Sequence, residues 1–551
     1  MSLSERVQAK AFERRWAILA VLCFGLLVIV LDNSILNVAI PTIVRELEAS
    51  NSDIQWIVDS YTLVFAGLLL TMGSLGDRYG RRGALQAGFV LFGIGSIASA
   101  LASSSGQLIA TRAFMGIGGA LIMPATLSII TNLFPANERG KAIGVWAGTA
   151  GMAGALGPLT GGFLVEHFYW GSVFLVNIPI VIIGVLAGIF LIPTSKDPSA
   201  PRLDPFGAAL SIVGLCALLY GIIEAPADGW TDSTILAAFA VGLVLMGVFV
   251  WWEMATDHPM LDVRFFKNPR FSAASGSITL IFFAMFGSIF LLTQYMQFTL
   301  GYTPLQTGVR LVPFALVMMI TAPLSPKVVA RIGTKLTVAL GLGIATVALV
   351  LTSTLTESSS YLELAVRFVL IGLGIGLTMA PATESVMGSL PLAKAGVGSA
   401  VNDTTRQVGG ALGVAVVGSV LSTVYGSQIA AFFRGRAAPP GAQAAAESGL
   451  GGAFEVAAQL RRLAVPGSGS LANDLVQTAN GAFVDAMQAG MLVAAGATLL
   501  GVIVALVWLP ARAPHHDVEV QAQEFAAEHA ADGTPPVDPD TGEVVATQGS
   551  T

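Results

Sequence analysis

The tetrapeptide Gly154–Gly157 (GALG) recurs at Gly410–Gly413, and both copies lie inside long apolar segments. At the same offset, glycines 140 and 162 are matched by glycines 396 and 418. Glycine is unfavourable in an ordinary helix interior, but in a membrane helix small residues let two backbones pack closely. The repeat therefore predicts a duplicated helical bundle whose two halves press together at these glycine-rich helices.

The composition is that of a membrane protein. Only 11% of the residues are charged and 54% are hydrophobic, whereas soluble domains carry roughly 25% charged residues. The mean hydropathy is +0.75. The apolar runs are continuous rather than alternating, which favours spanning helices over a β-barrel. The excess of acidic residues lies in the C-terminal tail, so no basic face is available for nucleic acid.

Apolar segments long enough to span a bilayer, about 20 residues each, recur along the whole chain. We expect spans at 16–40, 54–75, 83–103, 108–130, 143–165, 171–193, 205–224, 233–253, 271–297, 305–326, 337–355, 361–385, 397–424 and 483–509.

Lysine and arginine set the expected orientation, because they accumulate in cytoplasmic loops. With the N-terminus inside, the basic short loops are cytoplasmic and the short external loops hold only Arg45. We therefore expect a multi-pass protein of a bacterial plasma membrane with both termini in the cytoplasm. Residues 425–482 become a partly flexible external loop, with a short surface helix around 453–463.

The repeat divides the chain, because spans 1–6 correspond to spans 9–14 and spans 7–8 are inserted between them. Two repeated six-helix halves around a midplane site are typical of a rocking transporter. The expected regions are a cytoplasmic N-terminus (1–15), an N-terminal bundle (16–193), inserted helices with their loops (194–270), a C-terminal bundle (271–510) and a disordered acidic cytoplasmic tail (511–551).

Several motifs carry a family resemblance. The turn Gly73–Arg82 (GSLGDRYGRR) resembles the loop 2–3 signature of the major facilitator superfamily, and Arg112–Gly119 (RAFMGIGG) resembles its fourth-span signature. Gly154–Gly162 (GALGPLTGG) resembles the fifth-span antiporter signature. Leu31–Pro41 (LDNSILNVAIP), Arg406–Gly410 (RQVGG) and the inserted spans resemble the fourteen-span drug/proton antiporters.

This resemblance implies an all-α polytopic major facilitator fold with 14 transmembrane helices. It also implies export by proton antiport. The helix carrying Gly154, Gly157, Pro158, Gly161 and Gly162 is then the antiporter helix. The resemblance further implies a cytoplasmic gate between the halves, built from Gly73, Asp77, Arg78, Gly80 and Arg81. The alternative interpretation is that these basic residues only determine the orientation of the chain in the membrane.

Charged residues within spans are the candidates for coupling, because an unpaired charge there is costly and faces a partner or water. The clear intramembrane acids are Asp32, Asp59 and Asp403, and Arg112, Arg310, Arg367 and Arg406 also fall inside predicted spans. Burial raises the pKa of a carboxyl and a neighbouring arginine lowers it, so proton exchange requires that balance to change between transport states.

Depth along the helices limits which charges pair. Asp32, Asp59 and Arg112 all fall in the outer half of the first repeat, so Arg112 pairs with Asp32 or with Asp59. Asp403 and Arg406 share one helix face at i,i+3. We expect Asp32, Asp59 and Arg112 to couple protons, Asp32 first among them; a structural helix–helix hydrogen bond is the alternative for Asp32.

The expected cargo site is largely apolar, with Asp403, Arg406, Met115 and Tyr295 as cavity candidates and Met123 and Phe282 among further liners. An apolar cavity with one or two acids suits lipophilic cations. We expect no enzyme activity, cofactor or metal, since the histidines form no spanning metal set and no phosphate loop is present.

The expected function is proton-coupled export of lipophilic, often cationic drugs across the plasma membrane. The partners are small-molecule drugs, protons and the lipid bilayer, and the protein is expected to be a monomer. One alternative is a dedicated exporter of a single endogenous metabolite, such as an antibiotic, lipid or siderophore. An alternative of another class is a non-transporting membrane sensor or scaffold, which would not need matched halves with mid-depth charges.

Overall fold

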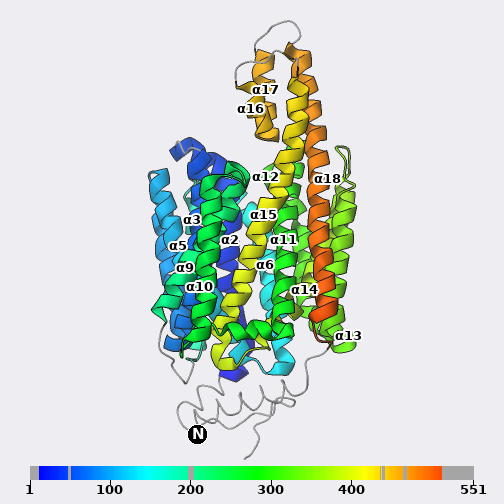
Figure 1. The fold of residues 1–551 in the computed structure, drawn as a ribbon. Coiled ribbons are helices and arrows are strands. Elements are labelled where there is room, and N and C mark those ends of the chain that lie inside the picture. Colours follow the sequence, from blue (N-terminus) through cyan, green and yellow to red (C-terminus); the bar gives the residue numbers. More distant parts are fainter. Residues whose placement is uncertain are drawn as a thin grey trace, which may run out of the picture.

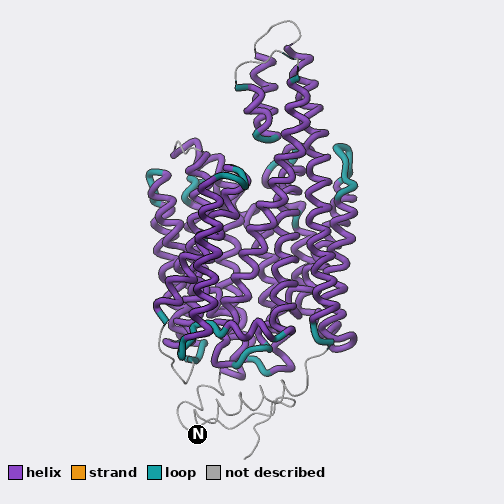
Figure 2. The backbone as a smooth tube through the Cα atoms, viewed as in Figure 1, coloured by secondary structure: helices purple, strands orange, loops and turns teal. Residues whose placement is uncertain are grey.

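The computed structural model describes residues 11–47, 51–196, 204–434, 436, 441–462 and 468–511. The expected cytoplasmic N-terminus lies largely outside these residues, and the expected disordered tail lies outside them beyond residue 511. Within the described residues the chain is helical, without strands, and short turns join most of the helices (Figure 2). The expectation of an all-α polytopic protein is therefore confirmed.

Thirteen helical segments among the described residues are long and apolar enough to cross a membrane. One of them, Leu305–Thr352, contains 48 residues and would extend about 70 Å as a single helix, more than twice a bilayer core of about 30 Å. The backbone breaks inside it at Gly333, where φ is 83°. It therefore contains the expected span 305–326 and all but the last three residues of the expected span 337–355.

The first six long segments pack into one group. They comprise α2 (Arg15–Leu47), α3 (Asn51–Tyr79), α4 (Arg81–Ala100), α5 (Ser105–Leu133), α6 (Ala136–His167) and the pair α7 (Ser172–Leu175) with α8 (Asn177–Leu191). The principal contacts are of α3 and α4 with α5, of α2 with α6, and of α8 with α2 and α4. This group is called the N-half below.

The second group, called the C-half below, repeats this plan. It comprises α11 (Pro269–Gln294) with η2 (Tyr295–Thr299), α12 (Pro304–Arg310), α13 (Val312–Thr352), α14 (Tyr361–Met387), η3 (Leu392–Lys394), α15 (Ala395–Phe433) and α18 (Ser468–Trp508). Gly80 and Gly333 occupy matching turns and both have positive φ, 116° and 83°. A side chain is strained in that conformation, so the two turns retain glycine.

An inserted hairpin connects the halves along the chain. It consists of α9 (Pro205–Asp228) and α10 (Ser233–Ala255), followed by η1 (Val263–Lys267). Helix α9 packs against α3 of the N-half and α15 of the C-half. Cys216 of α9 fills the space above Gly67 of α3. The hairpin therefore lies along one side of the junction between the halves (Figure 1).

Helix α2 begins and α18 ends on the same side of the bundle, at the bottom of Figure 1. We call this the inner side, because the basic loops predict that it is cytoplasmic, and we call the opposite side outer. Residues 425–482 were expected to be a partly flexible loop with a short surface helix around 453–463. The described residues contain a helix close to that position, but they are more helical than the loop that was expected. Helices α15 and α18 continue past the bundle on the outer side, where α16 (Ala442–Glu447) and α17 (Leu450–Arg462) pack beside them (Figure 1).

The reason for this difference is that hydropathy marks only the lipid-facing part of a helix. Helix α18 begins at Ser468, 15 residues before the expected start. Its early residues Ala472, Leu475 and Ala479 are buried, and the helix packs against α17. These residues recur at helical spacing, so one buried stripe holds the extension although its average hydropathy is low.

The GALG repeat joins helices within each half, not the two halves as expected. A Cβ on Gly157 of α6 would overlap the side chain of Ser34 on α2, and one on Gly413 of α15 would overlap the backbone of Phe283 on α11. Helix pairs α2–α6 and α11–α15 are thus equivalent. The contact between halves uses other glycines of the same helices: Gly144 of α6 abuts Pro323 of α13, and a Cβ on Gly396 of α15 would lie 2.6 Å from the carbonyl oxygen of Gly73.

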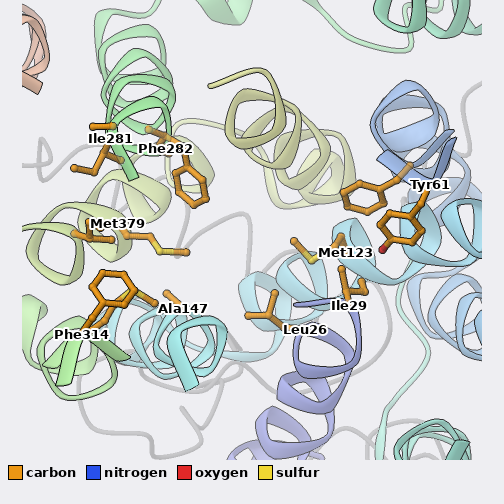
Figure 3. Close-up of a cluster of buried hydrophobic side chains, with 14 of the residues drawn as sticks. Leu26, Ile29, Tyr61, Met123, Ala147, Ile281, Phe282, Phe314 and Met379 are labelled. Atoms are coloured by element: carbon orange, nitrogen blue, oxygen red, sulfur yellow. The ribbon is translucent and has the colours of Figure 1, made fainter. Parts of the chain in front are cut away.

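Buried apolar side chains from both halves point toward one another at the centre of the bundle (Figure 3). Leu26 and Met123 belong to the N-half, and Phe282 and Met379 belong to the C-half. Each of these four is less than 9% exposed. Apolar side chains therefore line the junction of the two halves at this level.

Candidate functional site

A fully buried ion pair joins three helices of the N-half. The carboxylate of Asp32 on α2 pairs through Oδ2 with Nη1 of Arg112 on α5, and both side chains have 0% exposure. The second oxygen, Oδ1, accepts a hydrogen bond of 2.8 Å from Nδ2 of Asn177, the first residue of α8. Of the two partners left open by the sequence, the structure brings Asp32 to Arg112.

Further groups hold this ion pair in place. Ser96 of α4 accepts from Asn177 Nδ2 at 3.0 Å and donates to the carbonyl of Phe174 at 2.7 Å. The Arg112 guanidinium lies 4.4 Å from the ring centroid of Tyr61 on α3, and its Nε donates to the carbonyl oxygen of Ile57. The charge is thus surrounded by groups from four helices, and breaking the pair would leave a buried charge, which is costly.

Met115, a cavity candidate, belongs to this network. It has 0% exposure, and its sulfur lies 3.4 Å from Ser99 Oγ and 3.9 Å from Arg112 Nη1. The other candidate, Tyr295, is also fully buried and donates to the carbonyl oxygen of Thr356 at 2.5 Å. It begins the π-helical turn η2. Each of the two therefore packs inside its own half.

Asp59 lies apart from Arg112. Its carboxyl on α3 is half-buried and interacts electrostatically with Glu224 of the inserted helix α9. Glu224 accepts a hydrogen bond of 2.6 Å from Gln55, one turn before Asp59, and the ring of Trp56 stacks on Tyr220. The structure therefore places Asp59 where the N-half meets the inserted hairpin.

Asp403 and Arg406 form a second buried pair in the C-half. Arg406 Nη1 lies 3.7 Å from Asp403 Oδ1, and Nη2 donates to Thr383 Oγ1 of α14 at 2.9 Å. The guanidinium carbon is 4.9 Å from the ring centroid of Trp146 on α6 and 5.3 Å from that of Phe282 on α11. This cation therefore contacts both halves.

Two other arginines expected inside spans lie at helix ends. Arg310 ends α12, with its guanidinium 3.8 Å from the ring centroid of Tyr302. Arg367 Nε donates to the carbonyl oxygen of Leu351, at the end of α13. Local backbone carbonyls and aromatic rings satisfy both guanidinium groups, so each arginine can lie at the edge of an apolar segment.

On the inner side, a cluster of contacts links the two halves. We call it the latch and define it as Asp77, Arg81 and the segment Leu392–Val397. Arg81 Nε pairs with Asp77 at 2.9 Å, and both side chains are almost completely buried. Across the junction, the Asp77 carboxylate accepts from the backbone nitrogens of Gly396 and Val397 at 2.9 and 3.1 Å. Arg81 Nη2 donates to the carbonyl oxygens of Leu392 and Ala393 at 2.9 and 3.1 Å.

The remaining gate candidates divide by position. Gly73 allows this contact, since a Cβ there would lie 2.6 Å from the carbonyl oxygen of Gly396. Gly80 caps the start of α4 with positive φ. The guanidinium of Arg78 lies 5.5 Å from the exposed ring of Tyr79 in the N-half.

The antiporter-helix candidates of α6 contact different neighbours. Gly157 faces α2, whereas Pro158 fills the space beside Gly308 of α12 and Gly162 faces Leu305. Gly161 is buried, and Gly154 has open space beside it. The helix thus packs within the N-half on one face and against the C-half on the other.

The sequence analysis missed several functional candidates. Asn177, Ser96 and Trp146 are buried polar or aromatic partners of the charges, and the motif Asn177-Ile178-Pro179 in an apolar span was the available signal. Glu384, which was not counted among the clear intramembrane acids, interacts electrostatically with Arg139 of α6 and Arg270 of α11. It lies one residue before the end of the expected span 361–385.

The family model of the Major Facilitator Superfamily matches residues 22–414. The chain belongs to this superfamily. The matched region contains the Asp32–Arg112 pair, the latch and the Asp403–Arg406 pair. No group of three or more potential metal-binding side chains occurs in the described part of this transporter.

Curated relatives are similar over most of the transporter. The multidrug efflux pump LfrA of Mycolicibacterium smegmatis is 36% identical over 89% of this chain and 96% of its own. The tetracenomycin C resistance and export protein of Streptomyces glaucescens is 32% identical over 90% and 91%. The methyl viologen resistance protein SmvA of Salmonella typhimurium is 32% identical over 76% and 84%.

A solved structure supports the fold of this superfamily member. The human organic anion transporter MFSD10 (TETRAN) superposes with a TM-score of 0.56, covering 89% of this chain and 98% of that one. At 13% identity this similarity concerns the fold alone.

Proposed function

We propose that this transporter exports lipophilic, often cationic drugs across the bacterial plasma membrane in exchange for protons. The observation that carries the proposal is the Asp32–Arg112 pair, a carboxylate held at 0% exposure within an apolar bundle. Such a group can carry a proton, because protonation removes its charge and releases the arginine from its partner. The relatives named for multidrug efflux and methyl viologen resistance support drugs, including cations, as cargo.

Coupling follows from the energetics of this pair. In the deprotonated state Asp32 binds Arg112 and Asn177. A protonated Asp32 would no longer neutralise Arg112, whose remaining contacts are all with uncharged groups: the Tyr61 ring, the Ile57 carbonyl, the Asn33 amide oxygen and the Met115 sulfur. Rearrangement of α2, α5 and α8 would then accompany each proton that binds. The inward proton gradient supplies the energy, with an electrical part of about 2.3 kcal/mol per charge per 100 mV.

In this proposal both termini lie in the cytoplasm, as the basic loops predict. The latch on the inner side would then hold the cytoplasmic entrance closed while protons reach the site from outside. The transporter would work as a monomer in the lipid bilayer, since one chain supplies both of the six-helix halves that a rocking transporter needs.

The test is drug export from proteoliposomes with and without an imposed proton gradient. Asp32→Asn should abolish gradient-driven export, because an amide keeps the shape but cannot carry the proton. Glu455→Gln, which alters an exposed acid on α17, is the matched control and should behave as wild type. Gradient-driven export at the wild-type rate by Asp32→Asn would remove Asp32 from the mechanism.

A second candidate is export of one endogenous metabolite. It is favoured by the similarity to the tetracenomycin C resistance and export protein of Streptomyces glaucescens. The same proteoliposomes distinguish the two candidates: several unrelated lipophilic cations should be exported by a multidrug transporter, and none by a dedicated one.

A further inference from the structure

Each member of the Asp403–Arg406 pair leaves one buried polar atom without a hydrogen-bond partner among the described residues, and for Arg406 that atom is Nε. Arg406 has an aromatic face on two sides and the hydroxyl of Thr383 as a hydrogen-bond acceptor. Asp403 has its nearest arginine nitrogen at 3.7 Å and an amide contact at 3.4 Å from Asn402, while its Oδ2 has no hydrogen-bond partner among the described residues. The carboxylate can therefore accept another cation without losing a good contact.

We propose that the Arg406 guanidinium occupies the place of a lipophilic cation, so that cargo binds by displacing it from Trp146 and Phe282 and pairing with Asp403. This inference rests on the proposed function in one respect, the cationic character of the cargo. It goes beyond it by assigning Trp146 and Phe282 as an aromatic binding site and Arg406 as its internal competitor.

The arrangement has the components that recognise an organic cation. A cation over an aromatic face is attracted by the ring quadrupole, and Trp gives the strongest attraction. Trp146 has 0% and Phe282 has 7% exposure, so water does not screen this attraction. The carboxylate of Asp403 supplies the opposite charge, at 0% exposure.

The position of the cluster also couples binding to transport. Trp146 belongs to α6 of the N-half, while Phe282, Asp403 and Arg406 belong to α11 and α15 of the C-half. The Arg406–Trp146 contact exists only while the two halves are close at this level. A cation that replaces Arg406 therefore touches both halves, and its binding responds to their relative rotation.

An anionic cargo bound by Arg406 is the opposing interpretation, and the geometry disfavours it. The Asp403 carboxylate lies beside the guanidinium and would repel an anion there. The faces of the guanidinium are already covered by two rings. An anion bound there would gain the attraction of one arginine, but the contacts of that arginine with the two rings would be lost.

Two probes of equal shape and opposite charge separate these interpretations: tetraphenylphosphonium and tetraphenylborate. Binding to the purified full-length protein is measured by titration in detergent without a proton gradient. Arg406→Met should tighten tetraphenylphosphonium binding about tenfold, because the competing cation–aromatic contact is gone. It should not tighten tetraphenylborate binding.

The double variant Arg406→Met/Trp146→Leu tests whether the aromatic face carries the effect. If the aromatic face carries the effect, the double variant should bind tetraphenylphosphonium no more tightly than Trp146→Leu alone. If the effect of Arg406→Met is only the loss of a positive charge, the double variant should still bind about tenfold more tightly than Trp146→Leu. Arg310→Met is the matched control, since Arg310 also stacks on aromatic rings but at Tyr302 and Tyr361. It should leave binding of both probes unchanged.

A measurement on the protein with Arg406 intact guards against a misfolded variant. Tetraphenylphosphonium should change the tryptophan fluorescence of the protein with Arg406 intact, and this change should be absent in Trp146→Phe. Unchanged or weaker tetraphenylphosphonium binding by folded Arg406→Met overturns the inference, as does loss of tetraphenylborate binding alone. Because no gradient is present, failure of proton coupling in the Asp32→Asn experiment is distinguishable from failure here.

Discussion

Arg81→Ala should open the inner side of the transporter, and its neighbour provides a matched control. Arg81 donates to the carbonyl oxygens of Leu392 and Ala393 in the C-half. Arg82 donates at 2.8 Å to the carbonyl oxygen of Ile189, within the N-half. The two variants remove the same charge at adjacent positions, but only one removes contacts between the halves.

The magnitude follows from these contacts. Hydrogen bonds to a charged group contribute about 1.5–3 kcal/mol each, so two at the lower value give about 3 kcal/mol. That corresponds to roughly a 100-fold shift from the closed toward the open inner side. The shift is not larger because Asp77 keeps its bonds from the backbone nitrogens of Gly396 and Val397.

Spin labels report this shift as a change in distance distribution between the halves. Suitable sites are Tyr79 in the N-half and Leu336 in the C-half, which are 65% and 50% exposed, with Cys23 and Cys216 replaced by alanine. Arg81→Ala should populate a longer distance, and Arg82→Ala should resemble the parent. Equal responses of the two variants, or an unchanged distribution in Arg81→Ala, would refute the latch.

Three further predictions concern other contacts. Gly157→Leu should cost about 1–3 kcal/mol through overpacking against α2, lowering thermal stability and export, whereas Gly154→Leu should not because that position has open space. Glu384→Gln should weaken inner closure in the same spin-label assay by removing the charge that faces Arg139, whereas Glu363→Gln at the other end of α14 should not. A cysteine in α17 should react with a membrane-impermeant reagent added to intact cells while one at Ala511 should not, and reaction of both would contradict the topology.

The sequence predicted the helices well because membrane spans have a strong local signal. Each of the fourteen expected spans coincides with one helix or with consecutive helices, and none extends more than three residues beyond them. The family motifs indicated the fold that the comparisons confirm. The ends were less accurate where polar stripes extend a helix, as in α18. A short helix at the position of α17 was expected, but its packing against α18 and the packing of α16 against α15 depend on contacts that composition alone does not reveal.

The candidate site was predictable only in part. Depth along the helices restricted Arg112 to Asp32 or Asp59, and the three-dimensional arrangement selects Asp32. Contacts such as Asn177 with Asp32 and Trp146 with Arg406 join residues far apart in the chain. Nothing in either local sequence specifies its partner, so these pairs required the fold. The coupling and gating roles themselves remain predictions.

The two halves repeat one plan but close the inner side by different chemistry. The turns at Gly80 and Gly333 are equivalent, yet the latch acid Asp77 has no counterpart near Gly333, where the sequence is Val328–Ile332 (VVARI). On that side Gly140 of α6 leaves room for Glu384, which interacts with Arg139 and Arg270. A carboxylate thus interacts across the halves at both places, bound by backbone nitrogens in one case and facing arginines in the other. Because the partners differ, we expect substitution of one acid to leave the other contact intact, so that the inner side loosens in steps rather than opening at once.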